Sequence, residues 1–266
     1  MEMLQLNDLH KTFNPGTVNE KVALNGLSLK LNEGDFVTVI GGNGAGKSTM
    51  LNAVAGVWPV DEGQIIIDGT DVTKLSEYKR AAYLGRVFQD PMTGTAATMG
   101  IEENLALAKR RGKTRFLRSG ITKAEREEYK ELLKILNLGL EDRLTSKVGL
   151  LSGGQRQALT LLMATLQKPK LLLLDEHTAA LDPKTAAKVL DITDRIVNRD
   201  HLTTLMITHN MKDAIAHGNR LIMMMNGKII LDIQGEEKKK LTVKQLLDKF
   251  EEASGEEFSN DSAILG

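Results

Sequence analysis

The sequence predicts an α/β fold with a mostly parallel sheet, an antiparallel β portion at the N-terminal side and an inserted α-helical subdomain. Short apolar runs bounded by turn residues are typical of strands, and they recur at residues 4–9, 27–31, 36–40, 64–67, 84–88, 171–174, 204–208, 221–225 and 229–233. Helical periodicity appears at residues 49–55, 124–136, 154–166, 183–197 and 243–252. Strands that alternate with helices favour a parallel sheet covered by helices.

The helical subdomain is predicted from a change of pattern. Strand signals stop between Met99 and Leu150, where helix-favouring residues take over. We expect one domain, with a core and its β portion at residues 1–92 and 168–235 and the helical subdomain at residues 93–167. The tail, residues 236–266, is rich in Glu and Lys and is predicted to form a peripheral helix and a frayed end.

Composition limits the possible functions. Of the 266 residues, 41% are hydrophobic, which supports a core. The 35 Lys and Arg balance the 35 Asp and Glu, so nothing indicates a dedicated nucleic-acid binder. The absence of cysteine excludes disulfides and favours a cytosolic location. No apolar stretch approaches the roughly 20 residues that span a bilayer, so a membrane role would need a partner.

A phosphate-binding loop is predicted after the strand at residues 36–40. The segment from Gly41 to Ser48 fits the pattern G-x-x-x-x-G-K-[ST] and precedes a helical pattern. Its backbone N–H groups can converge on phosphate oxygens, while the Lys47 ammonium reaches the β and γ phosphates and the Ser48 hydroxyl can ligate Mg²⁺. The predicted nucleotide contacts are Gly41, Asn43, Gly44, Ala45, Gly46, Lys47, Ser48 and Thr49.

Two adjacent carboxylates, Asp175 and Glu176, follow the apolar run at residues 171–174. Neighbouring residues on a strand point to opposite sides, so we expect different roles for them. Asp175 is assigned to the Mg²⁺ shell and Glu176 to the attacking water, a role worth roughly 10²- to 10⁴-fold in rate. An acidic turn that merely closes a strand is the alternative, and the phosphate loop argues against it.

Two further polar residues follow predicted strands. His209 comes after a strand expected to lie beside the 171–174 strand, from which its imidazole could hydrogen-bond the γ-phosphate. Gln89 follows the 84–88 strand and could reach Mg²⁺ or the water. The remaining histidines considered, His10, His201 and His217, are interpreted as ordinary polar residues.

A second possible phosphate contact lies in the segment Leu151-Ser152-Gly153-Gly154-Gln155, which opens a helix just before the acidic strand. In this order, the motifs resemble those of the ATP-binding subunits of ATP-binding cassette (ABC) transporters, over Met3 to about Phe250. The resemblance implies a P-loop NTPase core of RecA type, with ATP and Mg²⁺ as cofactors. It also implies that Ser152, Gly153, Gly154 and Gln155 contact the γ-phosphate of ATP on a second copy, in a head-to-tail dimer around two ATP.

Three features are less well defined by this resemblance. Phe13 falls where the family stacks an aromatic ring on adenine, although a core aromatic beside the first strand is an equal alternative. His177 and Ala179 depart from the commoner Pro-Thr-Ser-Ala-Leu-Asp of this loop, and we interpret His177 as a loop residue and not a ligand. A solvated surface explains the basic run better than lipid, a membrane subunit or nucleic acid; the run comprises Lys109, Arg110, Arg111, Lys113, Arg115 and Arg118.

The resemblance implies a peripheral ATPase subunit at the cytoplasmic face of the cell membrane. It would drive solute import, with amino acids as candidate cargo, through separate integral-membrane permease subunits, served indirectly by an extracellular or periplasmic solute-binding protein. One alternative is a soluble relative acting on DNA or ribosomes, but neither a long coiled coil nor a second cassette is evident. The other is a nucleotide-dependent membrane scaffold, against which the intact Glu176 and His209 argue.

Overall fold

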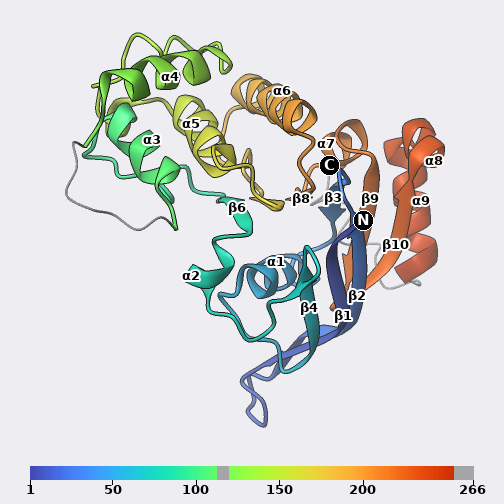
Figure 1. Ribbon diagram of the computed structural model, residues 1–266. Coiled ribbons are helices and arrows are strands. Elements are labelled where there is room, and N and C mark those ends of the chain that lie inside the picture. Colours follow the sequence, from blue (N-terminus) through green and yellow to red (C-terminus); the bar gives the residue numbers. More distant parts are fainter. Residues whose placement is uncertain (113–119, 255–266) are drawn as a thin grey trace.

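The computed structural model describes residues 1–112 and 120–254, which form two sheets and their surrounding helices (Figure 1). The larger, six-stranded sheet has the order β10-β9-β3-β8-β7-β6, and its strands are parallel except for the antiparallel β9–β10 pair. Its strands are β3 (Phe36–Ile40), β6 (Leu84–Val87), β7 (Leu171–Asp175), β8 (Thr204–Ile207), β9 (Arg220–Met225) and β10 (Lys228–Gln234). The prediction of a mostly parallel sheet is confirmed.

The smaller sheet is antiparallel, with the order β2-β1-β4-β5. It consists of β1 (Glu2–Phe13), β2 (Lys21–Asn32), β4 (Glu62–Ile67) and β5 (Thr70–Asp71). Apolar side chains of β1, β2 and β4 share one buried cluster with helix α1 (Lys47–Ala55) and with one face of the larger sheet. The predicted antiparallel portion at the N-terminal side is therefore also confirmed.

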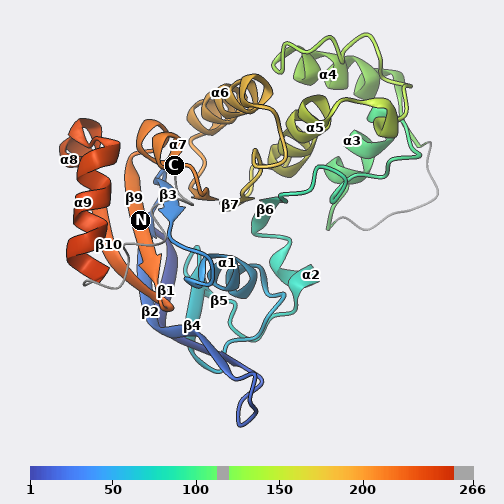
Figure 2. The same cartoon turned by 180° about the vertical axis from the view of Figure 1, so that it is seen from behind.

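The helical subdomain lies beyond β6 (Figures 1 and 2). It contains α3 (Ile101–Lys109), α4 (Lys123–Lys134) and α5 (Gly153–Thr165), and its apolar side chains pack with those of β6, β7 and α6 (Pro183–Asp200). In the basic run, Lys109 pairs with Glu128 and Arg110 with Glu125 on α4, so this part is not freely solvated. Lys113, Arg115 and Arg118 lie outside the described residues.

The C-terminal helices pack at the opposite edge of the larger sheet (Figures 1 and 2). The pattern at residues 243–252 is confirmed as α9 (Val243–Ser254), whose Leu246 and Phe250 are buried against the Ile40 and Leu221 side of the sheet. The sequence analysis did not predict three short helices, α2 (Glu77–Arg80), α7 (Met211–Ala216) and α8 (Gly235–Lys240). Among the helices in the described ranges, none is both long and apolar enough to cross a bilayer.

The parallel strands bring the predicted motifs to one edge of the larger sheet. The phosphate loop follows β3, the Asp175–Glu176 pair ends β7, Gln89 follows β6 and His209 follows β8. Strands β3, β7 and β8 are buried on both faces, which explains why they read as continuous apolar runs. Ligands of open α/β sheets bind beyond the carboxyl ends of such strands.

Candidate active site

The phosphate loop has a backbone that only glycine can adopt without strain at two key points. Gly41 has a φ of 150° and Gly46 a φ of 101°, both in the region that disfavours other residues. A Cβ on Gly41 would lie 2.2 Å from the Met224 carbonyl oxygen, and one on Gly46 would lie 2.5 Å from that of Ala23. The loop therefore passes close to neighbouring backbone before α1 begins, and it presents the N-terminus of α1 to a ligand.

Lys47 is buried at the start of α1, where its Nζ donates hydrogen bonds to the carbonyl oxygens of Gly41 at 2.6 Å and Gly42 at 3.1 Å. Burial lowers the pKa of Lys47, and the nearby charges of Glu176 and Asp175 oppose this shift. The ammonium group is thus fixed against the phosphate loop and lies within electrostatic reach of the two carboxylates.

A cavity of about 280 Å³ lies over this loop, lined by loop residues, Phe13, Lys21, Ala23 and Glu176. The half-buried ring of Phe13 stands edge-on to Trp58, with ring centroids 5.1 Å apart. Phe13 borders the cavity and does not belong to the buried apolar cluster of β1, a position that suits the predicted adenine contact. Lys21, from β2, was not foreseen because its sequence surroundings give no hint of the phosphate loop opposite.

The two carboxylates have different surroundings, but not through alternation along one strand: β7 ends at Asp175, and Glu176 follows it in a left-handed backbone conformation with a φ of 44°. Glu176 lines the cavity over the phosphate loop, and its Oε2 lies 3.6 Å from Nδ1 of His209. Asp175 lines an adjacent cavity of about 430 Å³ together with Gln89. Burial raises the pKa of Asp175, and the Arg86 guanidinium, 3.6 Å from its Oδ2, is the main opposing influence.

Arg86 is a residue that the sequence analysis missed. Its Nη2 donates to Oδ1 of Asn52 on α1 at 2.7 Å, and the Asn52 amide donates to the Ser48 carbonyl oxygen at 2.8 Å. Its guanidinium also lies over the Phe88 ring, 4.5 Å from the centroid. The sequence signal that could have identified it is a charged arginine within an otherwise apolar strand, β6. Arg86 therefore connects Asp175 to the first turns of α1.

The polar side chains at this edge fit a magnesium ion by their chemistry. Ser48 offers an exposed hydroxyl at the end of the phosphate loop, and Asp175 and Gln89 offer a carboxylate and an amide oxygen. Mg²⁺ prefers such oxygen ligands and commonly keeps water and substrate phosphates in its remaining positions. Within the described ranges, no cluster of three or more His, Cys, Asp or Glu forms an all-protein metal site.

The predicted signature segment lies apart from the phosphate loop of the same chain. Ser152 is exposed and caps α5: its Oγ accepts from the Gln155 backbone N at 3.3 Å, while its own N donates to the Gln155 side chain at 3.2 Å. Of the residues described here, none from Ser152 to Gln155 lines the cavity over the phosphate loop. A Cβ on Gly154 would lie only 2.1 Å from Thr185 Cγ2, so this glycine also allows α5 and α6 to pack closely.

Comparisons with known proteins identify the family. The ABC transporter family model matches residues 24–179. The tyrosine transport ATP-binding protein of Clostridioides difficile is 46% identical over 256 residues, covering 94% of this chain and 100% of that protein. The methionine import ATP-binding protein MetN of Rhizobium johnstonii is 35% identical, over 86% of this chain and 60% of the longer relative.

Solved structures agree with the sequence comparisons. An ATP-binding cassette solved as a dimer in a post-hydrolysis state, bound to ADP and Pi, matches with a TM-score of 0.74 and 30% identity, covering 87% of this chain and 98% of that one. The ADP conformation of another cassette matches with a TM-score of 0.76 and 27% identity, covering 94% and 98%. The chain belongs to the ABC transporter family, as one of its ATP-binding ATPase subunits.

Proposed function

We propose that two copies of this chain close head-to-tail around two ATP and that hydrolysis reopens them, driving solute import through separate integral-membrane permease subunits. The observation that carries this proposal is the separation of the two phosphate-binding segments within one chain. The phosphate loop borders its cavity together with Glu176, whereas Ser152 and Gly153 are exposed elsewhere. A second copy would supply them.

Within each site we assign roles to the residues at the carboxyl ends of the strands. Lys47 and the backbone N–H groups of residues 41–49 bind the phosphates, and Phe13 stacks on the adenine. Glu176 orients and deprotonates the attacking water. His209, whose Nδ1 lies 3.6 Å from Oε2 of Glu176, contacts the γ-phosphate. Gln89 positions the water or the metal from beside Asp175.

Ser48, Asp175 and Gln89 are proposed to hold Mg²⁺, which when bound would neutralise charge on the β and γ phosphates. The oxygen donors in the two adjacent cavities support this assignment. Arg86 keeps Asp175 next to α1, which carries Ser48, through its bond to Asn52. These residues therefore set the relative positions of the ligands before nucleotide arrives.

ATP acts as the closing ligand in this proposal. A ligand shifts a conformational equilibrium only through its different affinities for the two states. Ser152, Gly153, Gly154 and Gln155 would meet the γ-phosphate only in the closed dimer, so ATP favours closure and its hydrolysis removes the contact. The similarity to a cassette solved as a dimer supports self-association of two copies.

We propose that the cargo is an amino acid and that the permease contacts the cleft between core and helical subdomain, at the cytoplasmic face of the membrane. The names of the tyrosine and methionine relatives support the cargo class. A largely apolar cavity of about 440 Å³ lies between β6 and helices α3 and α5 and includes Arg86. A solute-binding protein would deliver the cargo outside the cell. The division into residues 1–92 with 168–235, 93–167 and 236–266 is part of this proposal.

Replacing Glu176 by Gln tests the proposed ATP hydrolysis site. The variant should bind ATP within about twofold of the wild type because the phosphate contacts remain, while turnover should fall roughly 10²- to 10⁴-fold. Gel filtration with ATP should show a persistent dimer. A variant that stays monomeric, or that turns over ATP normally, would refute the proposed site.

For the cargo, loss of labelled tyrosine or methionine uptake in a deletion strain is expected, and unchanged uptake of both would count against the amino-acid class.

A further inference from the structure

Glu176 has a backbone conformation that its own side chain disfavours. Its φ is 44°, in the left-handed region that residues with a Cβ rarely adopt. Two backbone hydrogen bonds flank this conformation: its N donates to the Ile207 carbonyl oxygen at 3.0 Å, and its carbonyl oxygen accepts from Ala179 N at 2.9 Å. Such a conformation persists only where surrounding contacts hold it. The question is which side chain fixes the turn that follows Glu176.

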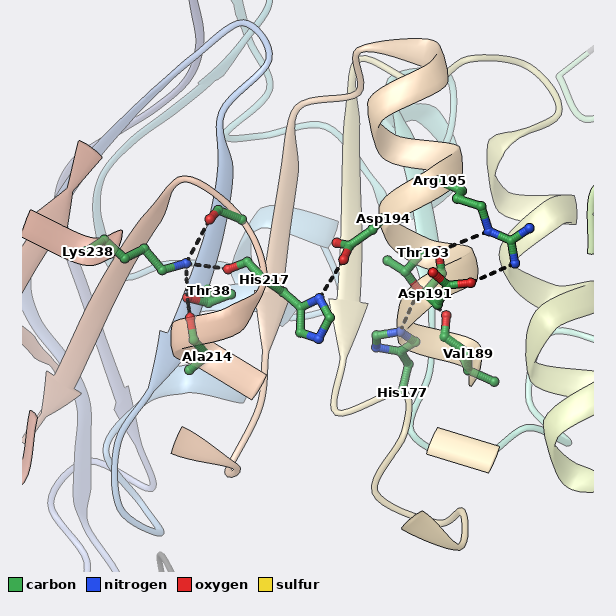
Figure 3. Close-up of polar contacts among 11 residues, drawn as sticks. Thr38, His177, Val189, Asp191, Thr193, Asp194, Arg195, Ala214, His217 and Lys238 are labelled. Atoms are coloured by element: carbon green, nitrogen blue, oxygen red, sulfur yellow. Dashed lines mark hydrogen bonds and ion pairs between the residues drawn. The ribbon is translucent and has the colours of Figure 1, made fainter. Parts of the chain in front are cut away.

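The next residue, His177, is fixed to helix α6 (Figure 3). Its side chain is buried, with 1% of the residue exposed, and its Nε2 lies 3.1 Å from Oγ1 of Thr193. Thr193 is itself fully buried and lies on the face of α6 that packs inward. The turn after β7 is therefore attached to α6 by a side-chain contact directly beside Glu176.

The direction of this hydrogen bond follows from the neighbouring contact. The Thr193 hydroxyl donates to the Val189 carbonyl oxygen at 2.9 Å, one turn earlier on α6 (Figure 3). A hydroxyl has a single hydrogen to donate. With that hydrogen directed to Val189, Thr193 accepts from His177, and we assign the imidazole proton to Nε2 on this basis. The contact is directional, and a side chain of similar size without a donor would not reproduce it.

His177 also stands where the sequence departs from the commoner proline. A proline would restrict its own φ to about −65° and would need no side-chain partner to stiffen the turn. A histidine lacks that ring constraint, so in this chain a contact of the imidazole can add to the backbone hydrogen bonds that hold the turn. The bond to Thr193 is the polar contact of the imidazole that does so.

We propose that His177 is a positioning residue for Glu176: its hydrogen bond to Thr193 anchors the turn after β7 to α6 and keeps the Glu176 carboxylate aimed at the nucleotide cavity. This inference rests on the proposed role of Glu176 in hydrolysis. It implies that breaking the bond lowers the rate of the chemical step and leaves ATP binding intact, because the phosphate loop does not depend on this turn.

The test compares full-length variants by their kcat, their KM for ATP and their ATP affinity. His177→Leu removes the donor, and Thr193→Val removes the acceptor with little change of shape. His177→Gln restores a donor, since the Gln amide nitrogen can occupy the place of the imidazole Nε2. The matched control is His217→Leu. His217 pairs with Asp194, the residue after Thr193 on α6, at 2.7 Å (Figure 3). Unlike His177, it follows α7 and is not next to Glu176 in the sequence.

We expect kcat to fall about tenfold in His177→Leu and Thr193→Val, with ATP affinity within about twofold of the wild type. The double variant should be no slower than either single one because both remove the same bond. His177→Gln and His217→Leu should stay within about threefold of the wild-type kcat.

The inference is overturned if Thr193→Val keeps wild-type kcat, if His217→Leu loses as much, or if ATP affinity weakens in step with kcat. Should His177→Leu not fold, the nearly isosteric Thr193→Val decides the outcome alone. Glu176→Gln is measured alongside. If it retains turnover, the proposed site itself is wrong; if it abolishes turnover while Thr193→Val does not, only the positioning role fails.

Discussion

Helix α1 follows the buried Gly46 and helix α5 begins at the exposed Gly153, but their N-termini are completed differently. The N-terminus of α1 has no side-chain cap among the described residues and faces a cavity bordered by Lys47 and Glu176. The N-terminus of α5 is closed by the reciprocal bonds of Ser152 and Gln155, in an exposed position. The first is an incomplete anion site with its own cation, whereas the second is a stable helix start that can offer donors to another molecule. The difference fits our proposal that the reaction centre is divided between two chains.

Of the variants that follow, the one that removes the cation at α1 should have the largest effect, and the quantity it changes is ATP affinity. In Lys47→Ala the phosphates lose a buried ammonium and its charge-assisted hydrogen bonds, so ATP affinity should fall about 10³-fold. Isothermal titration with ATP would measure the loss. Lys21→Ala is the control, because Lys21 lines the same cavity but is exposed, and it should cost less than about tenfold. Equal losses in both variants would contradict the central place given to Lys47.

A charge change at α5 should leave ATP binding intact and slow ATP turnover. Gly153→Asp places a carboxylate in the first turn of α5, where the helix dipole favours it, so the fold should persist. The same charge would repel a γ-phosphate presented by a second copy. We expect turnover to fall about 10²-fold with ATP affinity within about twofold.

Mixing variants shows whether the two halves belong to different chains. A dimer of Lys47→Ala with Gly153→Asp contains one intact site if the arrangement is head-to-tail, so ATPase activity should reappear on mixing. A mixture of Lys47→Ala with the Lys47→Ala/Gly153→Asp double variant contains no intact site and serves as the control. An inactive first mixture would argue that each chain completes its own site.

The sheet and the phosphate loop could be predicted because their signals are local. Central strands such as β3 and β7 are apolar on both faces, and the loop follows β3 at the spacing its chemistry requires. Helix α3 (Ile101–Lys109) was expected only as part of a helical region, since its nine residues carry little periodic signal. The six-residue α7 and α8 were missed for the same reason.

Side-chain contacts between residues far apart in the sequence could not be predicted from local sequence patterns. Arg86 hydrogen-bonds to Asn52, 34 residues away in the sequence, and the residues around each of them do not predict this contact. His177 was interpreted as a loop residue, and it does lie in a turn, but its burial against Thr193 depends on how α6 packs. The close approach of Gly154 to Thr185 likewise depends on tertiary packing. The roles assigned to the site residues remain predictions.

The smallest expected effect separates the two uses of Ser152, capping α5 and contacting phosphate. Replacing an N-cap serine by Ala costs about 1 kcal/mol of stability, whereas Gly costs only a few tenths. Both variants lose the hydroxyl, so their ATPase rates should fall together by severalfold while their urea unfolding midpoints differ. If activity instead follows stability, with Ser152→Gly near the wild-type rate, the hydroxyl serves α5 alone and the phosphate contact must come from the backbone of Gly153 and Gly154.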